Sequence, residues 1–128
     1  MSEFSNYLEN AIINATLRNT AYTSPSAVYV ALFTSDPTDA GSGTEVSGNA
    51  YARKQATFSS PSNGVTSNSA DITFDQATGN WGTVSHLGIF DASSSGNLLY
   101  HTALTSSKTI ETGDIFKIAT SSLVVTLT

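Results

Sequence analysis

The chain has 128 residues, a formal net charge of −5, only 12% charged residues and no cysteine. These figures exclude disulfide bridges and thiolate metal sites, and five basic residues are too few for a phosphate-binding surface. We therefore expect no nucleic-acid partner. No stretch is apolar enough for a transmembrane helix or a signal peptide, so we expect no membrane partner either. The 20 Ser and 18 Thr residues suit turns and strand surfaces, which favours an all-β protein.

Residues 3–19 form the one predicted helix. Its apolar side chains recur with a period of 3.6 residues, at Phe4, Leu8, Ala11, Ile12 and Ala15. Ser2 or Ser5 provides an N-cap, since a hydroxyl there accepts a hydrogen bond from the first helical turn. We expect the apolar stripe to pack on a sheet. Ile13 and Leu17 widen that stripe, and the alternative is that they contact another subunit.

Residues 28–33, VYVALF, are apolar on both faces and predict a central strand buried on both sides. The polar segment 35–49 follows without any periodicity, and loops of this length are usually functional or mobile. It carries three carboxylates, at Asp36, Asp39 and Glu45. Their spacing is not that of an EF-hand, so we expect no metal site but a solvated loop that reaches toward a neighbour.

Residues 50–59 alternate between two faces and predict an edge or interface strand. One face carries Tyr51, Arg53, Gln55 and Thr57. Residues 60–69 contain Pro, Asn and Gly and are interpreted as a loop. A half-buried strand follows over residues 70–75.

Residues 81–104 predict a β-hairpin around the turn DASSSGN. We expect one face of its first strand to carry Trp81, Thr83, Ser85, Leu87 and Ile89, and the other to carry Val84, His86 and Phe90. Gly88 indicates a bulge or a closely approaching neighbour.

A Thr-Gly turn at residues 112–113 separates this hairpin from a strand with Ile115, Phe116 and Ile118. A last strand runs over residues 123–127. Seven or so short strands with frequent turns predict one domain over residues 1–128, in which a β-rich body (28–128) follows the helix. The expected fold is all-β, a β-sandwich or jelly roll with one N-terminal α-helix.

Catalytic patterns are absent, since the chain contains no GxSxG, P-loop, HExxH or GxGxxG motif. We expect neither a nearby carboxylate nor a third ligand for His86 and His101, so we interpret them as structural residues. The even spacing of Asp71 and Asp75 predicts a shared strand face, but nothing indicates the cleft that a glycosidase needs. We therefore expect no enzymatic activity, no cofactor and no metal.

Three segments resemble small phage virion proteins that are described as tail fibre proteins. They are YVALFTSDPTDAG with the following GTEVSG, the triplet Tyr51-Ala52-Arg53, and the hairpin LGIFDA–GNLLYHTAL. In size and composition these proteins resemble capsid decoration, or cement, proteins. The resemblance covers nearly the whole chain and implies a virion protein, on the capsid surface or the tail, made in the host bacterial cytoplasm. It supplies no catalytic residues.

Because the chain has no repetitive shaft, we expect a capsid decoration protein that binds and stabilises the assembled head. Its partners would be the major capsid protein or other virion proteins. The alternative is a tail fibre or tail-associated protein that binds a carbohydrate receptor, with Tyr51 and Trp81 as the aromatic platform.

Closed symmetry lets one interface repeat around an axis, and we expect a homotrimer. The candidate interface residues are Ile13, Leu17, Asp36, Asp39, Glu45, Tyr51 and Arg53.

Overall fold

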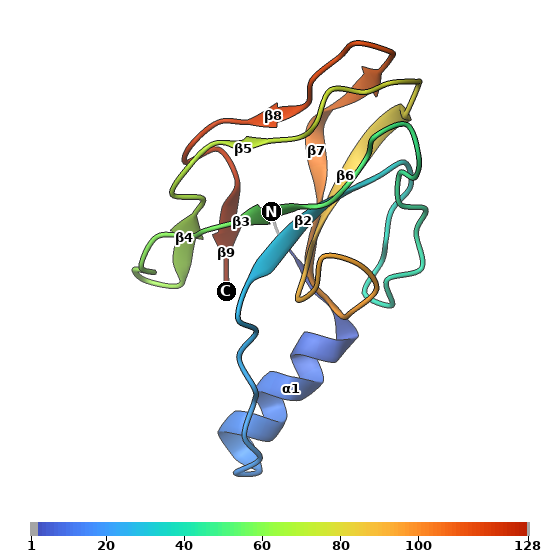
Figure 1. Ribbon diagram of the computed structural model, residues 1–128. Coiled ribbons are helices and arrows are strands. Elements are labelled where there is room, and N and C mark those ends of the chain that lie inside the picture. Colours follow the sequence, from blue (N-terminus) through green and yellow to red (C-terminus); the bar gives the residue numbers. More distant parts are fainter. Residues whose placement is uncertain (1–2, 128) are drawn as a thin grey trace.

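The computed structural model describes residues 3–127, and in this range the chain forms one helix and nine strands (Figure 1). In chain order the elements are β1 (Glu3–Phe4), α1 (Asn6–Leu17), β2 (Val28–Phe33), β3 (Lys54–Ala56), β4 (Val65–Ser67), β5 (Ile72–Thr73), β6 (Gly82–Phe90), β7 (Leu98–Ile110), β8 (Lys117–Ile118) and β9 (Val124–Thr126). The strand pairs are antiparallel. The predicted mostly-β fold with one N-terminal helix is confirmed.

The largest sheet has five strands in the order β1-β7-β6-β2-β3, and two short ladders, β4–β9 and β5–β8, complete the fold. Apolar side chains from the large sheet, from both ladders and from the segments that connect them form the main core: Val30, Leu32, Val46, Ala56, Ile72, Phe74, Ala77, Trp81, Val84, Leu87, Ile89, Ile110, Phe116, Ile118, Leu123 and Val125. The two ladders therefore act as a second layer, which covers one face of the large sheet.

Strand β2 is buried on both sides, as its uninterrupted apolar sequence predicts. Side chains alternate across a strand, so Val30 and Leu32 enter the main core while Ala31 and Phe33 face the opposite side. There Ala31 and Phe33 form a second cluster with Phe90 and Leu98. Each face of the large sheet thus has its own apolar packing.

The predicted hairpin is the pair β6–β7, but one of its face assignments is wrong. Val84 lies in the main core together with Leu87, three residues further on. A register shift between Val84 and His86 explains this, because an extra residue reverses the alternation of side chains. Gly88 has the predicted close neighbours, since a Cβ on it would lie 2.9 Å from Leu98 Cδ1.

The helix begins at Asn6, three residues later than predicted, because Glu3 and Phe4 pair with β7 instead. Ser5 is the N-cap: its Oγ accepts a hydrogen bond from the Leu8 N–H at 3.1 Å. Ser2, the other predicted cap, lies outside the described residues. The same Ser5 hydroxyl donates to the carbonyl of Leu98, which ties the helix start to β7.

The predicted packing of the helix on the sheet is wrong beyond its first turn. Helix α1 extends away from the sheet (Figure 1), and of its residues Leu8 is the one that is buried. Ala11 and Ile12 are half-buried, and Ala15 is exposed. One reason is that pairing of β1 with β7 sets the direction in which the chain leaves the sheet.

Two further segments differ from the prediction. Strand β3 lies at the predicted sheet edge but is only three residues long, so Tyr51 and Arg53 precede it in irregular backbone. The predicted loop over residues 60–69 contains β4, which pairs with β9. Asn68, which is fully buried, secures this region by donating to the carbonyls of Ala70 and Ala119, each at 2.9 Å.

Candidate functional site

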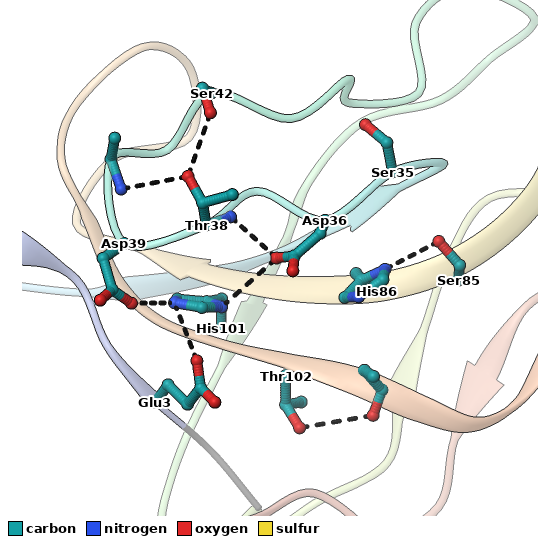
Figure 2. Close-up of polar contacts among 12 residues, drawn as sticks. Glu3, Ser35, Asp36, Thr38, Asp39, Ser42, Ser85, His86, His101 and Thr102 are labelled. Carbon is teal, nitrogen blue, oxygen red and sulfur yellow. Dashed lines mark hydrogen bonds and ion pairs between the residues drawn. The ribbon is translucent and has the colours of Figure 1, made fainter.

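Three segments that are distant in the sequence place four titratable side chains together (Figure 2). His101 stands on β7, and only 4% of its side chain is exposed. Its Nε2 lies 2.8 Å from Asp39 Oδ1 and 3.7 Å from Glu3 Oε2. On the other side of the ring, Nδ1 lies 3.9 Å from Asp36 Oδ1. We call these four residues the His101 cluster.

The backbone fixes each member of the His101 cluster. Glu3 is the register partner of His101 in the β1–β7 ladder, so its side chain shares that face of the sheet. The carbonyl of Asp39 accepts a hydrogen bond from the Asn6 N–H at 2.9 Å. Asp36 Oδ1 accepts from the Thr38 N–H at 2.8 Å, which forms a local Asx turn. The carboxylates therefore converge on a single imidazole.

Segment 35–49, predicted to be a solvated loop that reaches toward a neighbour, is largely exposed but is anchored to its own sheet. Pro37 is fully buried, and Val46 belongs to the main core. The Val46 N–H donates to the Leu32 carbonyl at 2.9 Å, so this part of the loop continues the edge that β3 begins. Asp36 and Asp39 are thereby turned toward His101.

The two histidines have different surroundings. The expectation that neither has a carboxylate nearby is wrong for His101, whose carboxylates come from the chain's first residues and from the 35–49 loop. His86 Nδ1 lies 2.8 Å from Ser85 Oγ on its own strand. The signal that sequence reasoning missed was the concentration of carboxylates in 35–49, which the fold brings to β7.

A second cluster, the Arg53 network, joins three of the predicted interface residues. Arg53 forms a bidentate ion pair with Glu45, with Nε–Oε2 and Nη2–Oε1 distances of 2.9 Å each. The Tyr51 hydroxyl donates to Glu45 Oε2 at 2.6 Å and accepts from the Leu32 N–H at 3.0 Å. Burial, and then the hydrogen bond to Glu45, raise the pKa of Tyr51 far above its ordinary value.

Arg53 also fixes the hairpin turn. Its Nη1 donates to the carbonyls of Ala92 and Ser95, at 3.0 and 2.8 Å, and its guanidinium lies 3.7 Å from the centre of the Phe90 ring. With 7% of its side chain exposed, Arg53 makes most of its contacts inside its own chain. The Arg53 network therefore has a structural role in the folded chain.

The predicted aromatic platform of Tyr51 and Trp81 is not exposed. Trp81 is buried, and its Nε1–H donates to the Asn49 carbonyl at 2.9 Å. Tyr51 packs edge-on against Trp81, with ring centres 5.4 Å apart. Because both rings belong to the core and its margin, neither offers a free face to a sugar.

A different surface is open beside the helix. A pocket of about 380 Å³ lies between the helix start, the 39–41 segment and the end of the hairpin turn. We call it the hairpin-end pocket; its lining is Ser5, Asn6, Tyr7, Asp39, Ala40, Gly41, Phe90, Gly96, Asn97 and Leu98. It combines two aromatic rings with a carboxylate and two amides.

The two remaining predicted interface residues are exposed on α1. Ile13 is 51% and Leu17 80% accessible, although both are apolar. Among the residues described, no helix is long and apolar enough to cross a membrane.

Comparison with known families identifies the chain. The model of the family described as podophage GP4 fiber I protein gp80 matches residues 3–126. The chain belongs to this family. No curated protein matches it by sequence. As a member of a phage fibre family, it is a virion-associated structural protein of the tail fibre class, which implies a non-enzymatic role and association with other virion proteins.

The family favours the tail fibre alternative over the capsid decoration role that we expected from the missing shaft. That role is not supported, because the matched family is described as a fibre protein. The matched family, and not the missing shaft, therefore decides between the two roles.

Proposed function

We propose that this chain is a tail fibre component that assembles with further copies of itself through the outer face of α1. The observation that carries the proposal is the exposure of Leu17 and Ile13 on a helix that extends away from the sheet (Figure 1). They are four residues apart and therefore neighbours on one helix face. An extended helix with an exposed apolar pair gains stability when another apolar surface covers it.

The charge of α1 also favours self-association. Over Asn6–Leu17 the helix carries a single charged side chain, Glu9. Copies that meet along this helix therefore bring few like charges together, although the whole chain has a net charge of −5. Asn10 lies on the face of Ile13 and Leu17, and an asparagine in such an interface helps to fix the register. A closed trimer around these helices would repeat one interface three times.

Replacing Leu17 with lysine should dissociate this assembly without unfolding the protein. The apolar contact is lost and three positive charges are brought together at the axis, whereas the exposed position makes the change harmless to the monomer. Native mass spectrometry should show trimers for the unmodified protein and monomers for Leu17→Lys.

The matched control is Ala15→Lys, because Ala15 is exposed on the opposite face of the same helix. This variant should remain trimeric. The proposal is wrong if the unmodified protein is monomeric and Leu17→Lys enters phage particles as efficiently as the unmodified chain.

A second candidate function, receptor binding, is favoured by the hairpin-end pocket. Tyr7, which is 41% exposed, lines this pocket together with Asn6 and Asp39. Sugars are held by an aromatic surface against their C–H groups and by amide or carboxylate groups at their hydroxyls. A volume of about 380 Å³ suits one or two sugar rings.

Removing the Tyr7 ring should weaken saccharide binding by about fivefold, since stacking contacts of this size contribute about 1 kcal/mol. A glycan array should identify a ligand for the unmodified protein, and titration should then show the loss in Tyr7→Ala. Ile115→Ala removes an exposed apolar side chain that does not line the pocket and should bind normally. Absence of any glycan ligand on the array would exclude this second function.

A further inference from the structure

The His101 cluster has the geometry of a metal site. Three potential ligand atoms lie within 4.8 Å of one another, one each from Glu3, Asp39 and His101. Two ligands of a tetrahedral zinc ion, each about 2.0–2.1 Å from it, are separated by about 3.3 Å. The distances from His101 Nε2 to Asp39 and Glu3, 2.8 and 3.7 Å, lie on either side of that value. Small side-chain movements would therefore complete the coordination.

The charges of the cluster favour a cation, although the three carboxylates are also in contact with solvent. Three carboxylates surround one imidazole, which carries at most a single positive charge. Nε2 holds at most one hydrogen, yet both Asp39 and Glu3 face this nitrogen, so a protonated ring cannot satisfy the two carboxylates equally. Within residues 3–127, the ion pairs of arginine and lysine are made with Glu45, Asp75 and Asp71, and none reaches this cluster.

The second nitrogen of the ring supports the same conclusion. Asp36 lies 3.9 Å from Nδ1, on the side of the imidazole that faces away from Glu3 and Asp39. Metal-binding histidines commonly donate the N–H of their other ring nitrogen to a carboxylate, and a movement of Asp36 by about 1 Å would form such a bond. Because His101 is buried, its ring is also held in place by its surroundings. Burial and the 2.8 Å contact of Nε2 with Asp39 thus orient the imidazole before any ion arrives.

We infer that Glu3, Asp39 and His101 bind a divalent transition-metal ion, for which Zn²⁺ is the appropriate probe. One imidazole nitrogen and two carboxylates suit zinc, whereas calcium and magnesium prefer oxygen ligands alone. Three protein ligands leave a fourth position for water or for a group from another molecule. The ion would join β1, the 35–49 segment and β7, and so secure the region from which α1 extends.

Isothermal titration of the full chain with Zn²⁺ should show one site per chain, and Ca²⁺ and Mg²⁺ should bind at least tenfold more weakly. Glu3→Gln and Asp39→Asn each remove one charged ligand and should weaken zinc binding at least tenfold. Glu3 is largely exposed, so its variant tests the site without disturbing the core. In NMR spectra, zinc should shift the Nε2 signal of His101 more than its Nδ1 signal.

His86→Gln is the matched control, because His86 is the other histidine of the chain and lies outside the cluster. It should bind zinc normally, and so should Asp75→Asn, which alters a carboxylate elsewhere. The inference is overturned if zinc does not bind stoichiometrically, if both Glu3→Gln and Asp39→Asn bind it undiminished, or if the His86 variant loses it.

Discussion

Replacing Leu87 with aspartate should leave the protein unfolded. Leu87 is 5% exposed and lies in the main core, between the large sheet and the two ladders that cover it. A carboxylate there has no positive partner, and burying it without one costs several kcal/mol. Since domains of this size are stable by about 5–15 kcal/mol, this one change removes most or all of the margin.

Circular dichroism and thermal melting check this result. Thr105→Asp is the matched control, since Thr105 is exposed on the paired strand β7, and its melting temperature should fall by only a few degrees. Phe90→Asp should destabilise the protein less than Leu87→Asp, because the Arg53 guanidinium already lies 3.7 Å from the Phe90 ring. Unchanged melting of Leu87→Asp would contradict the assignment of this hairpin to the core.

Hydrophobic patterning was sufficient to predict a strand whose burial follows directly from its own apolar residues. The uninterrupted apolar run VYVALF led directly to a strand with two apolar faces, which the separate packing of Leu32 and Phe33 confirms. Val84 shows the limit of such reasoning. A single register shift moves every following side chain to the other face, and it leaves no mark in a pattern of apolar and polar residues.

The helix illustrates a second limit. Its stripe of apolar residues correctly indicated an α-helix but not what would cover it. Two residues of strand pairing at Glu3 and Phe4 fix the direction of α1, and this pairing depends on a partner strand almost 100 residues later in the chain. Periodicity describes a helix; it does not say where that helix points.

The His101 cluster was not predictable because its members are brought together only by the fold. Asp39 and His101 are separated by 62 positions, and no motif connects them. The sequence did draw attention to the carboxylates of the 35–49 segment and to both histidines, but as separate features. Their combination required the β1–β7 pairing and the folding of that segment onto the sheet.

Replacing Arg53 with lysine should destabilise the protein by about 3 kcal/mol, although the charge is retained. Lysine cannot make the two parallel hydrogen bonds to Glu45, and it cannot also reach the Ala92 and Ser95 carbonyls. It also loses the planar contact with the Phe90 ring. The Glu45 carboxylate would then remain partly buried with the Tyr51 hydroxyl as its main partner.

Chemical denaturation measures this loss, and the neighbouring residue provides the control. Lys54 pairs with Asp75 at 2.9 Å, but the two side chains are 29% and 58% exposed. Lys54→Arg should therefore change the free energy of unfolding by less than about 1 kcal/mol. A double-mutant cycle with Glu45→Gln should assign most of the Arg53 effect to the ion pair. Similar small effects of Arg53→Lys and Lys54→Arg would mean that the hairpin turn is held by its own hydrogen bonds, such as those from Asn97 to Asp91, rather than by Arg53.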